Sequence, residues 1–78
     1  MKLQIALFEG FDELDALAPY EVLRRAEEAG TDMRVELVTL DPVDEVTAFY
    51  GLRIRPNGQL GAADRPDVLI VPGGGWNH

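Results

Sequence analysis

The sequence predicts an α/β fold in which helices sandwich a parallel sheet. Residues 2–8 (KLQIALF) and 67–72 (DVLIVP) are apolar almost throughout, which is typical of strands buried on both faces of a parallel sheet. An amphipathic helical pattern separates the first segment from another strand-like segment at residues 32–40. Strand, helix, strand is the repeating unit of parallel sheets. The chain therefore predicts a β-α-β unit, a hairpin and a further core strand.

Turn and helix signals follow the first strand. Gly10 allows a tight turn, and Asp12 is a residue type that caps helix N-termini. The pattern from residue 12 onward is helical except at Pro19, and proline is tolerated at the first position of a helix but poorly in its interior. We therefore expect a short turn over residues 12–18 and a helix that begins at Pro19.

The predicted helix runs to residue 29. Gly30 follows it in the position that glycine favours after a helix C-terminus. One stripe of the helix is apolar and the opposite face is charged, as expected for a helix that packs on a sheet. The residues of the apolar stripe are Val22, Leu23, Ala26 and Ala29.

The remaining segments predict strands and one small hairpin. Residues 32–40 alternate between apolar and polar and then become fully apolar, which predicts a second strand. Two β-like pieces at 46–50 and 52–55, with a turn signal at Asn57-Gly58, predict a small peripheral hairpin or arm. Residues 67–72 are expected to form the third core strand.

The predicted strands need more helices to cover them than the chain provides. At least two strands are expected to be buried on both faces, but the chain offers only one amphipathic helix to cover them. A bare sheet face would expose a large apolar patch. We therefore expect a second polypeptide or further sequence to cover that face. Residues 1–78 would then be the N-terminal part of a single α/β domain whose remainder is absent from this chain.

Composition excludes several classes of protein. The net charge is −7, from 14 acidic and 7 basic residues, which argues against binding nucleic acid or anionic membranes. There is no cysteine and one histidine, so neither a thiol nucleophile nor a metal-ligand cluster is expected. The opening segment continues into EGFDELD and not into a cleavage site, which predicts a first strand and a cytoplasmic protein.

Asp15 is the first candidate for chemistry. It lies near the start of the helical region, close to the carboxyl end of the first strand, where sites form in open α/β sheets. A carboxylate there could bind a nucleophile or act as a general acid or base. The alternative is an acidic residue that only stabilises the helix N-terminus, together with Asp12 and Glu13.

A run of glycines after the third strand is the second candidate. The N–H groups of Gly73, Gly74 and Gly75 could line an oxyanion hole, or the run could be a flexible strand exit. The run lacks the G-x-G-x-x-G spacing, so no nucleotide cofactor is expected. We expect no other cofactor either. Further candidates for the wall of a pocket are Gly10, Phe11 and Trp76.

Two stretches together resemble the ThiJ/PfpI superfamily. The first, FEGFDELDALAPYEVLRRA, has the form F-x-G-x-x-x-L-D-x-x-A-P-x-E-V, and the second, DVLIVPGGG, is a strand with a P-G-G turn. The resemblance implies a class I glutamine-amidotransferase-like, flavodoxin-like fold, of which this chain covers the amino-terminal part.

The resemblance also implies a site. Family members carry a cysteine nucleophile downstream of the P-G-G turn, a carboxylate at the position of Asp15, and a backbone donor at the position of Gly74, with Gly73 beside it. The cysteine has no counterpart in these 78 residues. The chain alone therefore cannot perform the family's reaction.

The resemblance leaves the activity open among several alternatives. The aspartate at position 15 makes the sequence resemble the isonitrile-hydratase branch of the family. In that branch a thiolate attacks a small-molecule substrate. Related amidase, peptidase and glyoxalase activities are alternatives, as is a chaperone-like member without catalysis. Another alternative is the ligand-sensing domain of a transcription regulator. Homodimers are common in the family. A natural stand-alone binding domain conflicts with the uncovered sheet.

Overall fold

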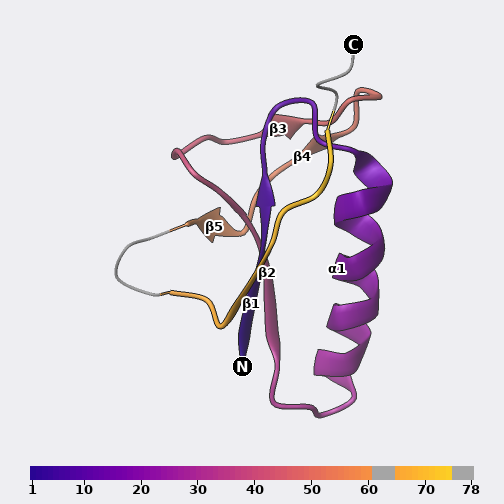
Figure 1. The fold of residues 1–78 in the computed structure, drawn as a ribbon, viewed down its shortest axis with the longest axis vertical. Coiled ribbons are helices and arrows are strands. Elements are labelled where there is room, and N and C mark those ends of the chain that lie inside the picture. Colours follow the sequence, from indigo (N-terminus) through magenta and orange to yellow (C-terminus); the bar gives the residue numbers. More distant parts are fainter. Residues whose placement is uncertain (61–64, 75–78) are drawn as a thin grey trace.

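The computed structural model describes residues 1–60 and 65–74. Within them, four strands form a parallel sheet in the order β5-β2-β1-β6, and a separate antiparallel pair joins β3 to β4. The single helix of these residues lies along the sheet (Figure 1). The predicted α/β fold is thus confirmed. The elements are β1 (Lys2–Leu7), α1 (Glu13–Glu28), β2 (Arg34–Thr39), β3 (Val46–Thr47), β4 (Arg53–Ile54), β5 (Gly58–Gln59) and β6 (Val68–Ile70).

The core lies between α1 and one face of the sheet. β1 is the central strand, and its Leu3, Ile5 and Leu7 are buried. In register beside them on β2 lie Val35 and Leu37, which are also buried. Because paired residues of parallel strands share a face, these five side chains form one apolar layer. The helix residues packed in the same cluster are Ala16, Tyr20 and Leu23.

The prediction of a turn over residues 12–18 is wrong. α1 is continuous over 16 residues and contains Pro19 in its interior. Asp12 caps it, because the Asp12 carboxylate accepts a hydrogen bond of 3.1 Å from the backbone N–H of Asp15. Proline removes only one helical hydrogen bond, the one to the carbonyl of Asp15, and the cap and the packed face outweigh that loss.

The buried face of the helix also differs from the predicted apolar stripe. Val22 was expected on the apolar stripe, but its side chain is 65% exposed. Ala29 is exposed as well, whereas Leu23 and Ala26 are half-buried. Gly30 ends the helix as predicted, with φ +98° and its N–H donating to the carbonyl of Glu27 at 3.1 Å.

The hairpin is confirmed, but it is not peripheral. β3 and β4 pair with Val46 opposite Ile54. Val46 and Ala48 belong to the core cluster, with exposures of 2% and 3%. The hairpin therefore closes the core above the carboxyl end of β1 (Figure 1).

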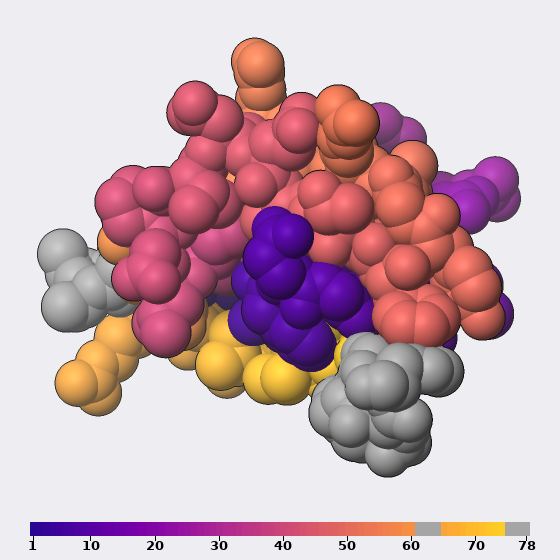
Figure 2. Space-filling view, turned by 90° about the horizontal axis from the view of Figure 1, so that it is seen from above, coloured from indigo at the N-terminus to yellow at the C-terminus, as the bar shows by residue number. Residues whose placement is uncertain are grey.

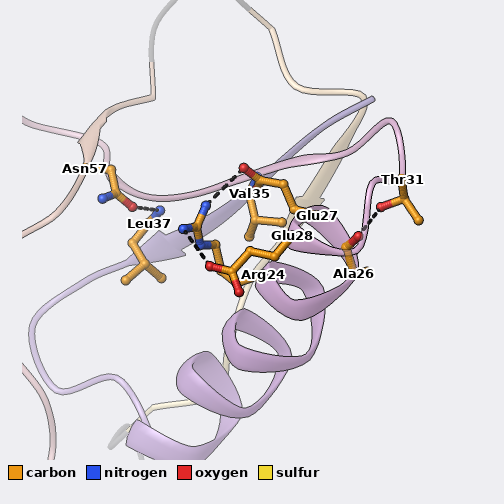
Figure 3. Close-up of polar contacts among 8 residues, drawn as sticks. All are labelled: Arg24, Ala26, Glu27, Glu28, Thr31, Val35, Leu37 and Asn57. Carbon is orange, nitrogen blue, oxygen red and sulfur yellow. Dashed lines mark hydrogen bonds and ion pairs between the residues drawn. The ribbon is translucent and has the colours of Figure 1, made fainter.

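The outer edge of β2 is closed by side chains and by a short strand that the sequence did not predict. Asn57 accepts a hydrogen bond of 2.7 Å from the N–H of Leu37, and Glu27 accepts one of 3.0 Å from the N–H of Val35 (Figure 3). β5 then continues along β2 as a parallel partner, where a turn was expected.

The second face of the sheet is mixed, with polar and apolar residues. On β1 it carries Lys2 and Gln4, and the Gln4 amide donates to Glu36 at 3.2 Å. Gln4 is only 2% exposed, and its Oε1 atom has no hydrogen-bond partner among the described residues. The same face also carries apolar residues, since Ala6 pairs with the fully buried Val38 and Gln4 pairs with Leu69, which is 45% exposed. Val71, just beyond β6, is 66% exposed. No helix in the described ranges is long and apolar enough to cross a membrane.

Candidate functional site

The carboxyl ends of β1 and β6 meet at one edge of the sheet. Phe11 and Gly74 form an isolated antiparallel bridge there, and the N–H of Asp12 donates to the carbonyl of Gly73 at 2.7 Å. Figure 2 looks down on this edge: the indigo loop after β1 lies between the yellow end of the chain's described part and the hairpin. The loop that leads into α1 is therefore held against the turn that follows β6.

Asp15 lies in the first turn of α1 and faces this turn. Its Oδ2 atom accepts a hydrogen bond of 3.3 Å from the backbone N–H of Gly73. Asp15 is exposed, so its second carboxylate oxygen is accessible to solvent or a ligand. Two of the predicted site residues are thus brought together from positions 58 residues apart.

A side chain at position 74 would require its neighbours to shift. A Cβ atom built on it would lie 2.5 Å from Cε2 of Phe8 and 3.1 Å from the carbonyl oxygen of Gly10. The interpretation of the glycine run as a merely flexible exit does not account for this close packing. The backbone of Gly74 therefore packs directly against the β1–α1 loop.

The loop is also fixed from its other side, by contacts that sequence reasoning missed. Glu9 accepts a hydrogen bond of 3.1 Å from the N–H of Thr47, and Glu13 accepts one of 2.9 Å from the N–H of Tyr50. The N–H of Phe49 donates to the carbonyl of Phe11 at 2.9 Å. No sequence signal announces these bonds, since they depend on the hairpin packing against a segment that is distant in the chain.

The other predicted pocket residues lie in different parts of the chain's structure. Phe11 is fully buried in the core, and Gly10 is half-buried with φ +83° in the turn after β1. Gly75 and Trp76 lie outside the described residues. Among residues 1–60 and 65–74, no three histidine, cysteine or acidic side chains gather where they could hold a metal ion.

Comparison with known proteins gives a family and a set of related folds. The model of the DJ-1/PfpI family matches residues 1–78. The curated protein sequences contain no match to this chain. Drosophila melanogaster DJ-1beta is similar in structure, with 28% identity and a TM-score of 0.80 over 94% of this chain and 38% of that protein.

Two further solved structures extend the comparison. An AraC family transcriptional regulator from Pseudomonas putida shares 27% identity, with a TM-score of 0.79 over 96% of this chain and 48% of the regulator. A mutant DJ-1 superfamily protein from Salmonella typhimurium has the same fold, with 23% identity and a TM-score of 0.80. This chain spans 38% of the Salmonella protein's length.

Proposed function

This chain belongs to the DJ-1/PfpI family, and we propose that it supplies the acid/base part of a cysteine-dependent hydratase or hydrolase site. The observation that carries the proposal is the 3.3 Å hydrogen bond from the N–H of Gly73 to the carboxylate of Asp15. It joins an exposed proton-transfer group to backbone donors at the edge of the sheet where α/β proteins bind their ligands.

In this mechanism a cysteine outside the 78 residues provides the thiolate. With an isonitrile, the Asp15 carboxylate takes the proton of the thiol and passes it to the terminal carbon as the sulfur adds there, which yields a thioimidate. Asp15 then takes a proton from water, and the hydroxide adds to the same carbon. The sulfur leaves with the proton that Asp15 returns, and the hydroxyl proton moves to nitrogen, which gives the formamide and restores the thiol. The net change is the addition of one water molecule.

The backbone donors have separate tasks in this proposal. The N–H of Gly73 is engaged with the Asp15 carboxylate and orients it. That leaves the N–H of Gly74 to stabilise negative charge on the substrate or on the sulfur. Related amide, peptide or carbonyl substrates would use the same arrangement, since each places charge on an atom next to the attacked carbon.

The partner of the chain, in this proposal, is the remainder of the same domain, and the assembled domain forms a homodimer in the cytoplasm. Support comes from the exposed apolar side chains of β6, Val68 and Leu69, which are 40% and 45% exposed. Outside β6 and Val71, the most exposed large apolar or aromatic side chains are those of Leu14, Val22, Leu40 and Tyr50.

A second candidate is the ligand-sensing domain of a transcription regulator. The similarity to the Pseudomonas putida regulator favours it, since this chain aligns over 96% of its own length with 27% identity. In that case the same edge would bind a small molecule without turnover. A helix-turn-helix segment in the complete protein, with no cysteine after the P-G-G turn, would decide for this candidate.

The first experiment is an intact-mass spectrum of the protein purified from its own source, under denaturing and then native conditions. We expect a species that contains a cysteine, either as a longer chain or as a second chain bound to this one. The assembled protein should react with iodoacetamide and hydrate a model isonitrile, and Asp15→Asn should abolish turnover. Asp44→Asn, in an exposed loop, is the matched control. A cooperatively folded monomer of 8.6 kDa would contradict the proposal.

A further inference from the structure

A second hollow lies on the same edge of the sheet, on the β2 side of the central strand. It is an open cavity of about 260 Å³ between the end of β1 and the loop that follows β2. Figure 2 looks onto this edge, where the indigo residues after β1 border the magenta loop. Asp15 and the P-G-G turn do not line it. Its lining residues are Leu7, Phe8, Glu9, Thr39, Leu40, Asp41, Val43 and Val46.

The floor of this cavity is apolar and its charges are all negative. Leu7 and Val46 are 3% and 2% exposed, so the base of the cavity belongs to the core. Leu40 and Val43, at 69% and 45% exposure, present apolar surface that a ligand would cover. Such a lining selects a ligand with an apolar body.

The polar groups of the cavity offer acceptors and no free donor side chain. Glu9 and Asp41 are its charged residues, and no lysine, arginine or histidine lines it. The Thr39 hydroxyl is the one side-chain donor of the lining, and it already donates to the carbonyl of Asp41 at 2.6 Å. The side chains of the cavity therefore favour a ligand that brings donors, and a positive charge over a negative one.

The Glu9 carboxylate and the backbone at Asp41 each make a hydrogen bond within the chain. The Glu9 carboxylate is fixed by the N–H of Thr47 at 3.1 Å, on the hairpin. The bond between Thr39 and Asp41 fixes the first turn of the loop on the opposite side. The Glu9 carboxylate therefore has less conformational entropy to lose on binding.

We propose that this cavity binds a small organic ammonium ion, with the alkyl or aryl body on Leu7, Phe8 and Val46 and the ammonium group at Glu9 and Asp41. The net charge of −7 attracts such a cation toward the protein. The inference does not depend on the proposed function, because none of these residues takes part in the chemistry assigned to Asp15.

The test is a titration of the protein with hexylammonium, followed by the backbone amide resonances. We expect saturable shifts at residues 39–46, tighter binding than for 1-hexanol, and weakening with added salt. Glu9→Gln and Asp41→Asn should each weaken hexylammonium binding about two- to five-fold, as expected for partly exposed ion pairs. Glu9→Gln keeps an oxygen that accepts from Thr47, so the loop stays in place.

Glu28→Gln on the exposed end of α1 is the control, because it removes one negative charge at a distance from the cavity. Equal binding of 1-hexanol and hexylammonium, equal weakening by the control, or the absence of saturable shifts would each overturn the inference. An Nα-acetyl-lysine amide identifies the source of the ammonium group. If it binds more tightly than hexylammonium, the natural ligand is a lysine side chain of another protein, and otherwise it is a free amine.

Discussion

The backbone N–H of Gly73 donates a hydrogen bond to the carboxylate of Asp15, at 3.3 Å and across 58 positions of sequence. The bond joins the exit of the last described strand to the first turn of the helix. It runs in parallel with a second link of 2.7 Å from the N–H of Asp12 to the carbonyl of Gly73. With two links, the turn keeps its place even when the side chain at position 15 changes.

The contribution of Asp15 to stability should therefore be separable from its proposed contribution to catalysis. Asp15→Asn retains an oxygen that accepts from Gly73, so we expect the free energy of unfolding to change by about 0.5 kcal/mol or less. Asp15→Ala should cost about 1 kcal/mol, because the bond is lost at an exposed position. Urea unfolding measures both. A loss of several kcal/mol in Asp15→Asn would mean that the residue is needed for the fold itself.

Gly74→Ala should destabilise the protein by about 1–3 kcal/mol. The new methyl group would lie 2.5 Å from the Phe8 ring, so the ring or the turn must shift, which is the cost of overpacking. Gly58→Ala is the control, because nothing lies within 4 Å of its added Cβ. Combining Gly74→Ala with Phe8→Leu should recover part of the loss, which a double-mutant cycle detects as coupling. Strict additivity would refute the proposed clash.

Asp12→Ala should lower the free energy of unfolding by about 1 kcal/mol, the usual cost of losing an N-cap. The same change should speed hydrogen exchange at the amide of Asp15, whose N–H bonds to the Asp12 carboxylate at 3.1 Å. Asp12→Asn keeps an acceptor and should restore both quantities. If Asp12→Asn is as unstable as Asp12→Ala, the cap is not the cause.

Much of the fold follows from local patterns. The apolar segment at 2–8 contains β1, Gly30 ends α1, and the pieces around residues 46 and 54 pair as a hairpin. The local pattern does not predict the start of the helix at Glu13. Pro19 argues for a later start, and the burial of Ala16 in the core, which favours the earlier start, is not visible in the local pattern. A proline costs a fixed local amount, but burial of a helix face is set by tertiary contacts that a local pattern does not contain.

The candidate site was only partly visible in the sequence. Asp15 and Gly73 follow from their places after two strands whose carboxyl ends share an edge. The carboxylates of Glu9 and Glu13 were not identified, since their partners at Thr47 and Tyr50 lie 38 and 37 positions away. Their bonds hold the loop from the hairpin side, and neither residue differs in type from the other exposed acids of this acidic chain.

The side chain of Asn57 closes the edge of β2, which gives the last prediction. Its Oδ1 atom accepts from the N–H of Leu37 at 2.7 Å, and its own N–H donates to the Leu37 carbonyl at 2.7 Å (Figure 3). Asn57→Ala leaves the N–H of Leu37, a residue that is 5% exposed, without its acceptor, and should cost about 1–3 kcal/mol. Hydrogen exchange at Leu37 should accelerate while exchange at Ile5, on the central strand, follows global unfolding. Asn57→Asp keeps an acceptor oxygen and should preserve the slow exchange of Leu37. Unchanged exchange in Asn57→Ala would mean that the side chain does not protect the amide of Leu37, and fast exchange in Asn57→Asp would mean that an acceptor oxygen at this position is not enough.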